Sequence, residues 1–126
     1  MTNLFDLTGK KAVVVGGAGG IGQAIAEGLL EAGAQVMISS RKEDSLCRAQ
    51  KELKESCGCR ALYHVGDATK EEDVMDLLKA ALREMGTVDI LVNSQGFNKK
   101  FPGTEFPEEQ WNAMFDANVK SVMFTC

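Results

Sequence analysis

The sequence lacks an apolar run long enough to cross a membrane, and residues 1–6 contain neither a basic segment nor an apolar one. A membrane-spanning helix needs about 20 mostly apolar residues, and a secretory signal needs both of those segments. We therefore expect no membrane partner and a cytoplasmic location.

An excess of positive charge is also lacking. The 126 residues include 14 Lys and Arg against 18 Asp and Glu, which gives a formal net charge of −4. The basic residues are scattered among acidic ones, whereas nucleic-acid-binding domains gather Lys and Arg on one face. This distribution argues against nucleic acid as a partner.

The four cysteines, Cys47, Cys57, Cys59 and Cys126, lack the spacing of a disulfide framework, which fits a reducing compartment. Cys57 and Cys59 could form a soft-metal site or a redox pair. The interpretation that we favour is a helix end capped by Gly58, with two small apolar side chains beside it. We therefore predict no metal site.

The chain does contain a glycine-rich stretch, Val13 to Gly22, in which three valines lead into a glycine cluster. The valines are typical of a strand, and a helical pattern begins at Gln23, so the predicted order is strand, tight turn and helix. Such a turn lets a phosphate approach the backbone, and the helix N-terminus directs free N–H groups at it.

These glycines fit two spacings, Gly16-x-x-x-Gly20-x-Gly22 and Gly17-x-Gly19-x-x-Gly22, and the second is usual in dinucleotide-binding folds. A flexible turn without a ligand is the alternative. No Gly-Lys-Ser/Thr follows, which argues against a mononucleotide P-loop.

With 44% apolar and 25% charged residues, the chain has the composition of one globular domain, and we predict a single dinucleotide-binding domain over residues 1–126 that breaks off within its last helix. Strand patterns at 11–15, 35–40, 61–65 and 88–92 alternate with helical patterns. This alternation favours an α/β fold, the first half of a Rossmann-type doubly wound parallel sheet with strand order 3-2-1-4.

The third helix is predicted from a capping-box pattern, Thr69-x-x-Glu72, and a closing Gly86. A last helix is predicted from Pro107 to Cys126. Six apolar residues are spaced to form the buried face of the third helix: Val74, Leu77, Leu78, Ala81, Leu82 and Met85.

The end of the second strand predicts the cofactor. A carboxylate there would bind the adenosine ribose of NAD(H), but this sequence has Ser40, Arg41 and Lys42. A hydroxyl and a guanidinium suit a 2′-phosphate, so NADP(H) is favoured, with NAD(H) still open. Glu43 and Asp44 lie one step further along and weaken this preference, and a solvated helix-entry pair is the alternative for Arg41 and Lys42.

Taken together, these features resemble the short-chain dehydrogenase/reductase family over the whole chain. The spacing of Gly16, Gly20 and Gly22 is similar to the family's cofactor turn, to which Gly19 and Ile21 also belong, although Val15 stands where Thr is usual. The resemblance therefore implies that these residues bind the dinucleotide.

The resemblance extends along the chain. Asp67-Ala68 is similar to the family's adenine contact, and Asn93-Ser-Gln-Gly96 is similar to its Asn-Asn-Ala-Gly element, with Ser94 and Gln95 as departures. Asn118 matches the Asn that the family uses to hold a water in its proton relay. A structural Asn satisfied by backbone is the alternative, because Trp111, Phe115 and Val122 share its helical face.

What the resemblance implies is hydride transfer between a nicotinamide cofactor and a secondary alcohol or ketone. We also expect a homo-oligomer, because the fourth strand would form an uncovered apolar edge and the last helix would lack part of its packing. Residues 3–10 and 105–111 look most like those of sugar-acid and polyol enzymes. The family's catalytic Ser, Tyr and Lys would follow Cys126, so we expect these 126 residues alone to be inactive. We interpret Tyr63 and His64 as structural.

Two other functions stay open at this point. One is a non-catalytic nucleotide-binding or interaction module. The other is a methyltransferase-type fold that binds S-adenosylmethionine, which the missing acid after the second strand disfavours. Titration with NADPH and NADH, followed by an activity assay, would separate the non-catalytic module from an oxidoreductase, and failure to bind S-adenosylmethionine would exclude the methyltransferase-type fold.

Overall fold

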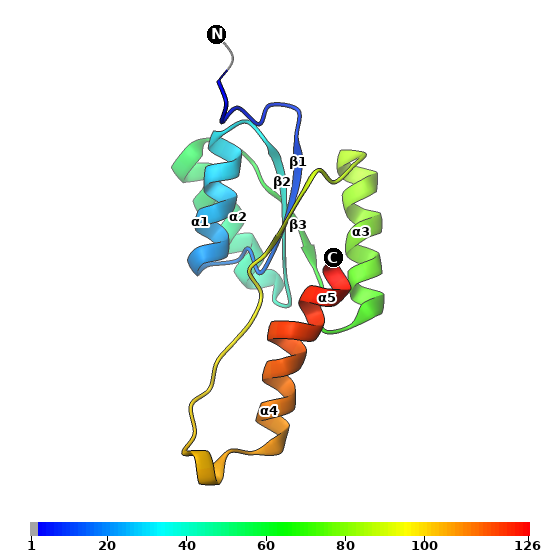
Figure 1. Ribbon diagram of the computed structural model, residues 1–126. Coiled ribbons are helices and arrows are strands. Elements are labelled where there is room, and N and C mark those ends of the chain that lie inside the picture. The colour runs from blue at the N-terminus through cyan, green and yellow to red at the C-terminus, as the bar shows by residue number, and fades with distance from the viewer. Residues whose placement is uncertain (1–2) are drawn as a thin grey trace.

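The computed structural model describes residues 3–126, in which four parallel strands form one sheet in the order β3-β2-β1-β4 (Figure 1). The predicted strand order is thus confirmed. The elements are β1 (Lys11–Val15), α1 (Gly20–Glu31), β2 (Gln35–Ser40), α2 (Glu43–Cys57), β3 (Leu62–Val65), α3 (Glu71–Met85), β4 (Ile90–Asn93), η1 (Gly103–Glu105), α4 (Glu108–Phe115), η2 (Asp116–Lys120) and α5 (Ser121–Thr125).

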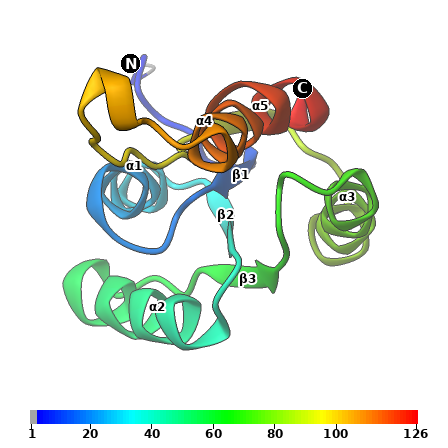
Figure 2. The ribbon, with the colours of Figure 1, turned by 90° about the horizontal axis from the view of Figure 1, so that it is seen from below.

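Helices cover both faces of the sheet, with α1 and α2 on one side and α3 on the other (Figure 2). The core is divided in the same way, because side chains alternate between the two faces of a strand. Along β1, Val14 packs toward α1 and α2, whereas Val13 and Val15 pack toward α3. The three valines that predicted a strand are therefore divided between two separate cores.

Glycines end two of the helices as predicted. Gly58 and Gly86 adopt φ values of +74° and +85°, and each N–H donates to a carbonyl of the last helical turn. The thiol of Cys57 donates to the Leu53 carbonyl oxygen at 3.1 Å, and burial is the main reason why the pKa of Cys57 is raised. The interpretation of this segment as a capped helix end is confirmed, and residues 3–126 contain no cluster suited to a metal ion.

Two predictions about α3 were wrong. The Thr69–Glu72 capping box does not form: Lys70 is the N-cap residue, and it makes no side-chain cap. Leu78 and Leu82 are 43% and 45% exposed, because α3 meets the sheet through smaller residues, Ala80 and Ala81, together with Leu77. The apolar stripe of α3 is wider than the part of the helix that packs against the sheet.

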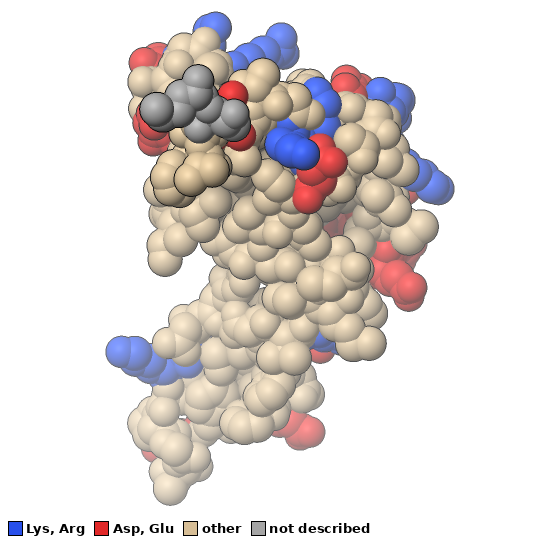
Figure 3. Space-filling model, turned by 45° about the horizontal axis from the view of Figure 1, so that its top comes forward, with Lys and Arg blue, Asp and Glu red and all other residues tan. Residues whose placement is uncertain are grey.

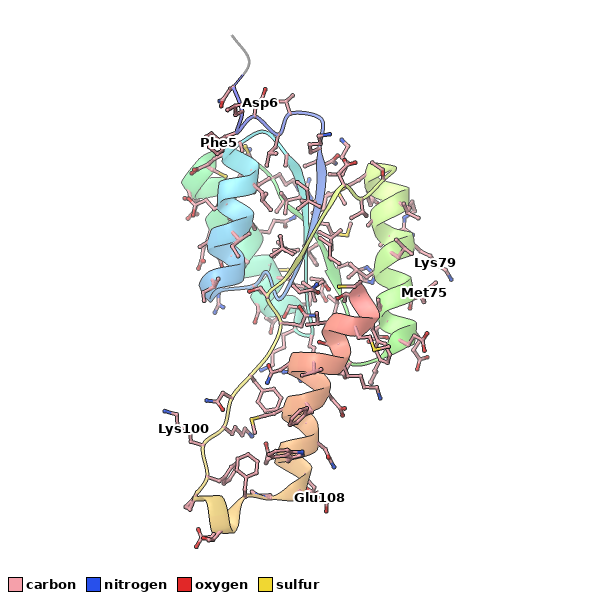
Figure 4. All side chains as sticks on the ribbon, viewed as in Figure 1. Phe5, Asp6, Met75, Lys79, Lys100 and Glu108 are labelled. Atoms are coloured by element: carbon pink, nitrogen blue, oxygen red, sulfur yellow. The ribbon has the colours of Figure 1, made fainter. Side chains whose placement is uncertain are left out.

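The chain after β4 extends away from the sheet as a long loop and returns through α4 (Figure 1). Lys100 projects outward from this loop (Figure 4). The Phe106 ring, also in this loop, packs edge to face against Phe101 and against Trp111 of α4. The predicted last helix is present but interrupted, since the π segment η2 separates α4 from α5. No helix within residues 3–126 is long and apolar enough to span a membrane.

Basic and acidic side chains are interspersed on the face shown in Figure 3, and no basic patch forms there. The two ion pairs within residues 3–126, Arg48–Glu52 and Arg83–Glu84, are both exposed. Exposed pairs of this kind contribute about 0–1 kcal/mol each, so packing and not charge holds this fold together.

Candidate functional site

A hollow of about 310 Å³ lies at the carboxyl ends of the strands, in the size range of small-ligand sites, roughly 300–1,000 Å³. It is the place predicted for a ligand in a sheet of this type. Seven of the residues predicted to bind a cofactor line it: Gly16, Gly19, Ser40, Arg41, Asp67, Ala68 and Gly96.

The glycine turn between β1 and α1 forms one wall. Gly16, Gly19 and Gly20 have φ values of +80°, +109° and +56°, a region that side chains disfavour. The N–H groups of Gly16 and Gly17 donate to the Ser39 carbonyl oxygen at 2.8 and 3.3 Å, so the turn is fixed to β2. The N-terminus of α1 consequently starts at the rim of the hollow.

Gly22 lies behind this wall and does not line the hollow. A β-carbon on Gly22 would lie 2.9 Å from the carbonyl carbon of Gly16 and closer still to its oxygen. Ile21 is 77% exposed, and Gly20 lines a shallow surface hollow between α1 and α2. The role of Gly22 is therefore to let helix and turn approach each other.

Ser40 and Arg41 line the hollow at the end of β2, whereas Lys42 precedes α2 outside it. The nearby acid Glu43 accepts a hydrogen bond from the Tyr63 hydroxyl at 3.2 Å. One of its two carboxylate oxygens is therefore hydrogen-bonded to β3.

Asp67 follows β3 and is held in one orientation by its neighbour. Its Oδ1 accepts hydrogen bonds from the backbone N–H and the hydroxyl of Thr69, at 2.9 and 2.7 Å. Burial raises the pKa of Asp67, but the Thr69 hydrogen bonds and the charges of Arg41 and Lys70 outweigh it, so the pKa is lowered overall. Asp67 thus presents an ionised carboxylate beside Arg41.

The end of β4 differs from the prediction in one respect. Asn93 turns its side chain toward α5, and its Oδ1 accepts hydrogen bonds from Thr125 of α5 and from Gln95 of the following loop. Asn93 does not line the hollow, and the residues that follow it do: Ser94, Gln95, Gly96 and Phe97.

Asn118 lies in the π segment and holds the loop after β4. Its Oδ1 accepts from the Phe97 N–H at 3.0 Å, and its Nδ2 donates to the Phe97 carbonyl oxygen at 2.9 Å. Gly96 has no room for a β-carbon because the Asn118 amide occupies that space. Asn118 is therefore satisfied by backbone, and Ala117 and Ser121 face the hollow in its place.

Tyr63 and His64 lie outside the hollow. Hydrogen bonds with Cys47 and Glu43 raise the pKa of Tyr63 to about 12. The phenol therefore stays protonated.

Sequence reasoning missed several lining residues: Val15, Ser39, Gly66, Thr69, Ser94, Gln95, Phe97, Ala117 and Ser121. Thr69 had a signal, because an Asp followed two residues later by Thr commonly forms a local side-chain turn. Ala117 and Ser121 had none, since the π segment that directs them is not visible as a sequence pattern.

Residues 10–126 match the sequence profile of the family described as short chain dehydrogenase. Gluconate 5-dehydrogenase of Gluconobacter oxydans (strain 621H) is 38% identical over 122 residues, which cover 97% of this chain and 47% of the relative. The chain spans about half the length of the relatives that it matches.

Solved structures agree with the sequence match. A short-chain type dehydrogenase/reductase from Mycobacterium marinum has a TM-score of 0.92 and 34% identity, covering 97% of this chain and 49% of that one. The L-sorbose reductase of Gluconobacter frateurii, solved with NADPH and L-sorbose, has a TM-score of 0.86 and 32% identity, covering 96% and 46%. These similarities reach from β1 through the last helix.

Proposed function

Since the chain belongs to the short-chain dehydrogenase family, we propose that it binds a nicotinamide dinucleotide, with NADP(H) favoured over NAD(H), as part of an oxidoreductase. The proposed reaction is hydride transfer between the nicotinamide and a secondary alcohol or ketone. The observation that carries the proposal is Arg41 at the rim of the hollow formed by the glycine turn.

The residues present fit such a ligand. Gly16 and Gly19 adopt backbone conformations that favour glycine, so the turn presents bare backbone at these positions. The N-terminus of α1 begins directly behind it. Unpaired N–H groups and the helix dipole both favour a pyrophosphate there. We assign the pyrophosphate to this turn and the adenine to Asp67 and Ala68, which line the hollow beyond β3.

The NADP(H) preference rests on Ser40 and Arg41. A guanidinium forms paired, charge-assisted hydrogen bonds with a phosphate, and a hydroxyl adds a donor. Glu43, which could weaken this preference, has one carboxylate oxygen hydrogen-bonded to Tyr63. Lys42, outside the hollow, would act only through its charge.

In this proposal the dinucleotide, when bound, supplies or accepts the hydride. The residues of this chain position it and keep the hollow shaped. We retain Asn118 as the residue that holds a water for proton transfer. Because both polar atoms of its side-chain amide bind Phe97, Asn118 would hold that water through its backbone.

The substrate class that we propose is a sugar acid or polyol. Support comes from the similarity to gluconate 5-dehydrogenase and to the L-sorbose reductase. For location we propose the cytoplasm, in keeping with four cysteines that are all free thiols.

We also propose a homo-oligomer. Trp111, Phe115, Val119 and Met123 recur every four residues along α4, η2 and α5, and all are at least half exposed. Val122, expected on this row, is displaced by the wider turn of the π segment. An exposed apolar row of this length favours pairing with a second copy.

The cofactor proposal is tested by titrating the chain and its Arg41→Asp variant with NADPH and NADH. Loss of a charge-assisted contact and addition of a repulsive carboxylate should weaken NADPH binding by about 2 kcal/mol or more, with little effect on NADH. Arg48→Asp is the matched control, because it changes the charge by the same amount at a residue that does not line this hollow. Equal losses for both cofactors would show that Arg41 does not read the phosphate.

A further inference from the structure

Gln95 lies at the start of the loop after β4, and among the described residues only one end of its side-chain carboxamide has a hydrogen-bond partner. Its Nε2 donates to Asn93 Oδ1 at 3.1 Å. Its Oε1 is buried and has no hydrogen-bond partner within residues 3–126. It is the single buried side-chain polar atom of this kind in the part of the chain that the structure describes.

A buried acceptor without a donor destabilises a folded protein, and such groups are few in native structures. Reversing the amide does not help, because it would place Gln95 Oε1 against Asn93 Oδ1, which already accepts from the Thr125 hydroxyl. Without a ligand, this arrangement leaves the amide oxygen without a donor. Gln95 also lines the hollow, so a ligand there is the available source of a donor.

The position of Gln95 indicates which part of a bound dinucleotide it would contact. The hollow extends from Asp67, after β3, past the glycine turn to Gln95, after β4. With the 2′-phosphate at Arg41, the far half of a dinucleotide reaches the β4 side. That half carries two ribose hydroxyls and a carboxamide N–H₂, all of them hydrogen-bond donors.

We propose that Gln95 is a cofactor-positioning residue whose Oε1 accepts a hydrogen bond from the nicotinamide riboside half of the bound dinucleotide. The inference rests on the proposed function and adds a contact at the opposite end of the hollow from Arg41. The last torsion of a glutamine side chain is broad and soft, so the oxygen turns into the hollow readily. Asn93 stays satisfied during this turn because Thr125 continues to donate to it.

The test compares wild type with Gln95→Met, which keeps the length of the side chain and removes the acceptor. Two ligands are titrated: NADPH, and adenosine 2′,5′-bisphosphate, which lacks the nicotinamide riboside. We expect the variant to bind NADPH about three- to tenfold more weakly and the bisphosphate equally well. Without ligand, its unfolding midpoint should be unchanged or higher, since an unpartnered acceptor has been removed.

Gln50→Met is the matched control. The Gln50 amide donates to the Ala61 carbonyl oxygen at 2.6 Å, between α2 and the start of β3, and it lies outside the hollow. The same chemical change there should lower the unfolding midpoint and leave both affinities unchanged. A merely structural Gln95 would behave like Gln50.

The outcomes are distinguishable. Equal NADPH affinity in wild type and Gln95→Met overturns the inference and leaves the proposed function standing. Equal weakening of both ligands also overturns it, because it would mean that the whole hollow has changed shape. A wild-type chain that binds neither ligand overturns the proposed function, and this assignment with it.

Discussion

Replacing Gly22 by alanine adds one carbon at the closest approach between α1 and the glycine turn. That carbon would lie 2.9 Å from the Gly16 carbonyl carbon and 3.2 Å from the Gly17 Cα, whereas carbon atoms prefer roughly 3.5–4.0 Å. Both neighbours are backbone, and the turn is tied to β2 through Ser39, so neither can rotate aside. We expect a loss of about 3 kcal/mol in unfolding free energy.

Relief of this overlap requires the turn to move into the hollow, so NADPH affinity should fall together with stability. The larger Gly22→Val change should abolish binding. Isothermal titration with NADPH and urea unfolding on the same samples measure both effects.

Gly28→Ala supplies the control for this prediction. Gly28 belongs to the same helix, and a β-carbon there meets nothing within 4 Å. Alanine should stabilise α1 at this position by roughly 0.5–1 kcal/mol and leave NADPH affinity unchanged. If Gly22→Ala behaves like Gly28→Ala, the close packing of helix and turn is not what forms the site.

Three further predictions concern other parts of the chain. Thr69→Val removes a hydrogen bond that lowers the pKa of Asp67. Ionised Asp67 stabilises the fold at neutral pH, and this stabilisation is lost on acidification. In the variant, we expect the loss to occur at a higher pH than in wild type. Urea unfolding between neutral pH and about pH 3 checks this, and superimposable profiles would refute it. Trp111→Lys should reduce self-association in sedimentation whereas Glu109→Lys should not, and a strictly monomeric wild type would refute the proposed oligomer. Residues 1–126 should bind NADPH without turnover, because Tyr63 and His64 lie outside the hollow, and NADPH oxidation by a mass-verified sample with a panel of ketones would contradict this.

The fold could be predicted because its signals are local and repeated. Valines at the start of the glycine stretch, and capping glycines such as Gly58 and Gly86, mark where elements begin and end. Once strands and helices alternate, the right-handed crossover rule leaves few arrangements. The parallel pairing of β1 with both β2 and β4 follows from these rules.

What the sequence could not supply is the direction in which individual side chains point. Asn93 ends its strand as expected, yet its amide turns toward Thr125 and away from the hollow. Thr69 was assigned to a capping box, but Asp67, two residues before it, accepts its hydroxyl first. In both cases a nearer partner outcompetes the expected one, and such competition depends on distances that a pattern does not contain.

The π segment explains why Asn118 fits both interpretations given to it from sequence. In a regular α-helix Asn118 would share a face with Trp111 and Phe115, and a polar group there would need a partner of its own. The wider π turn releases it from that face, so its amide reaches the backbone of Phe97 with two hydrogen bonds. This clamp fixes the first residues of an otherwise irregular loop, and those residues include Gln95 and Gly96 on the wall of the hollow. The structural role of the Asn118 side chain therefore serves a functional role of the π segment. The loop that Asn118 holds is the one that would contact the nicotinamide half of the cofactor.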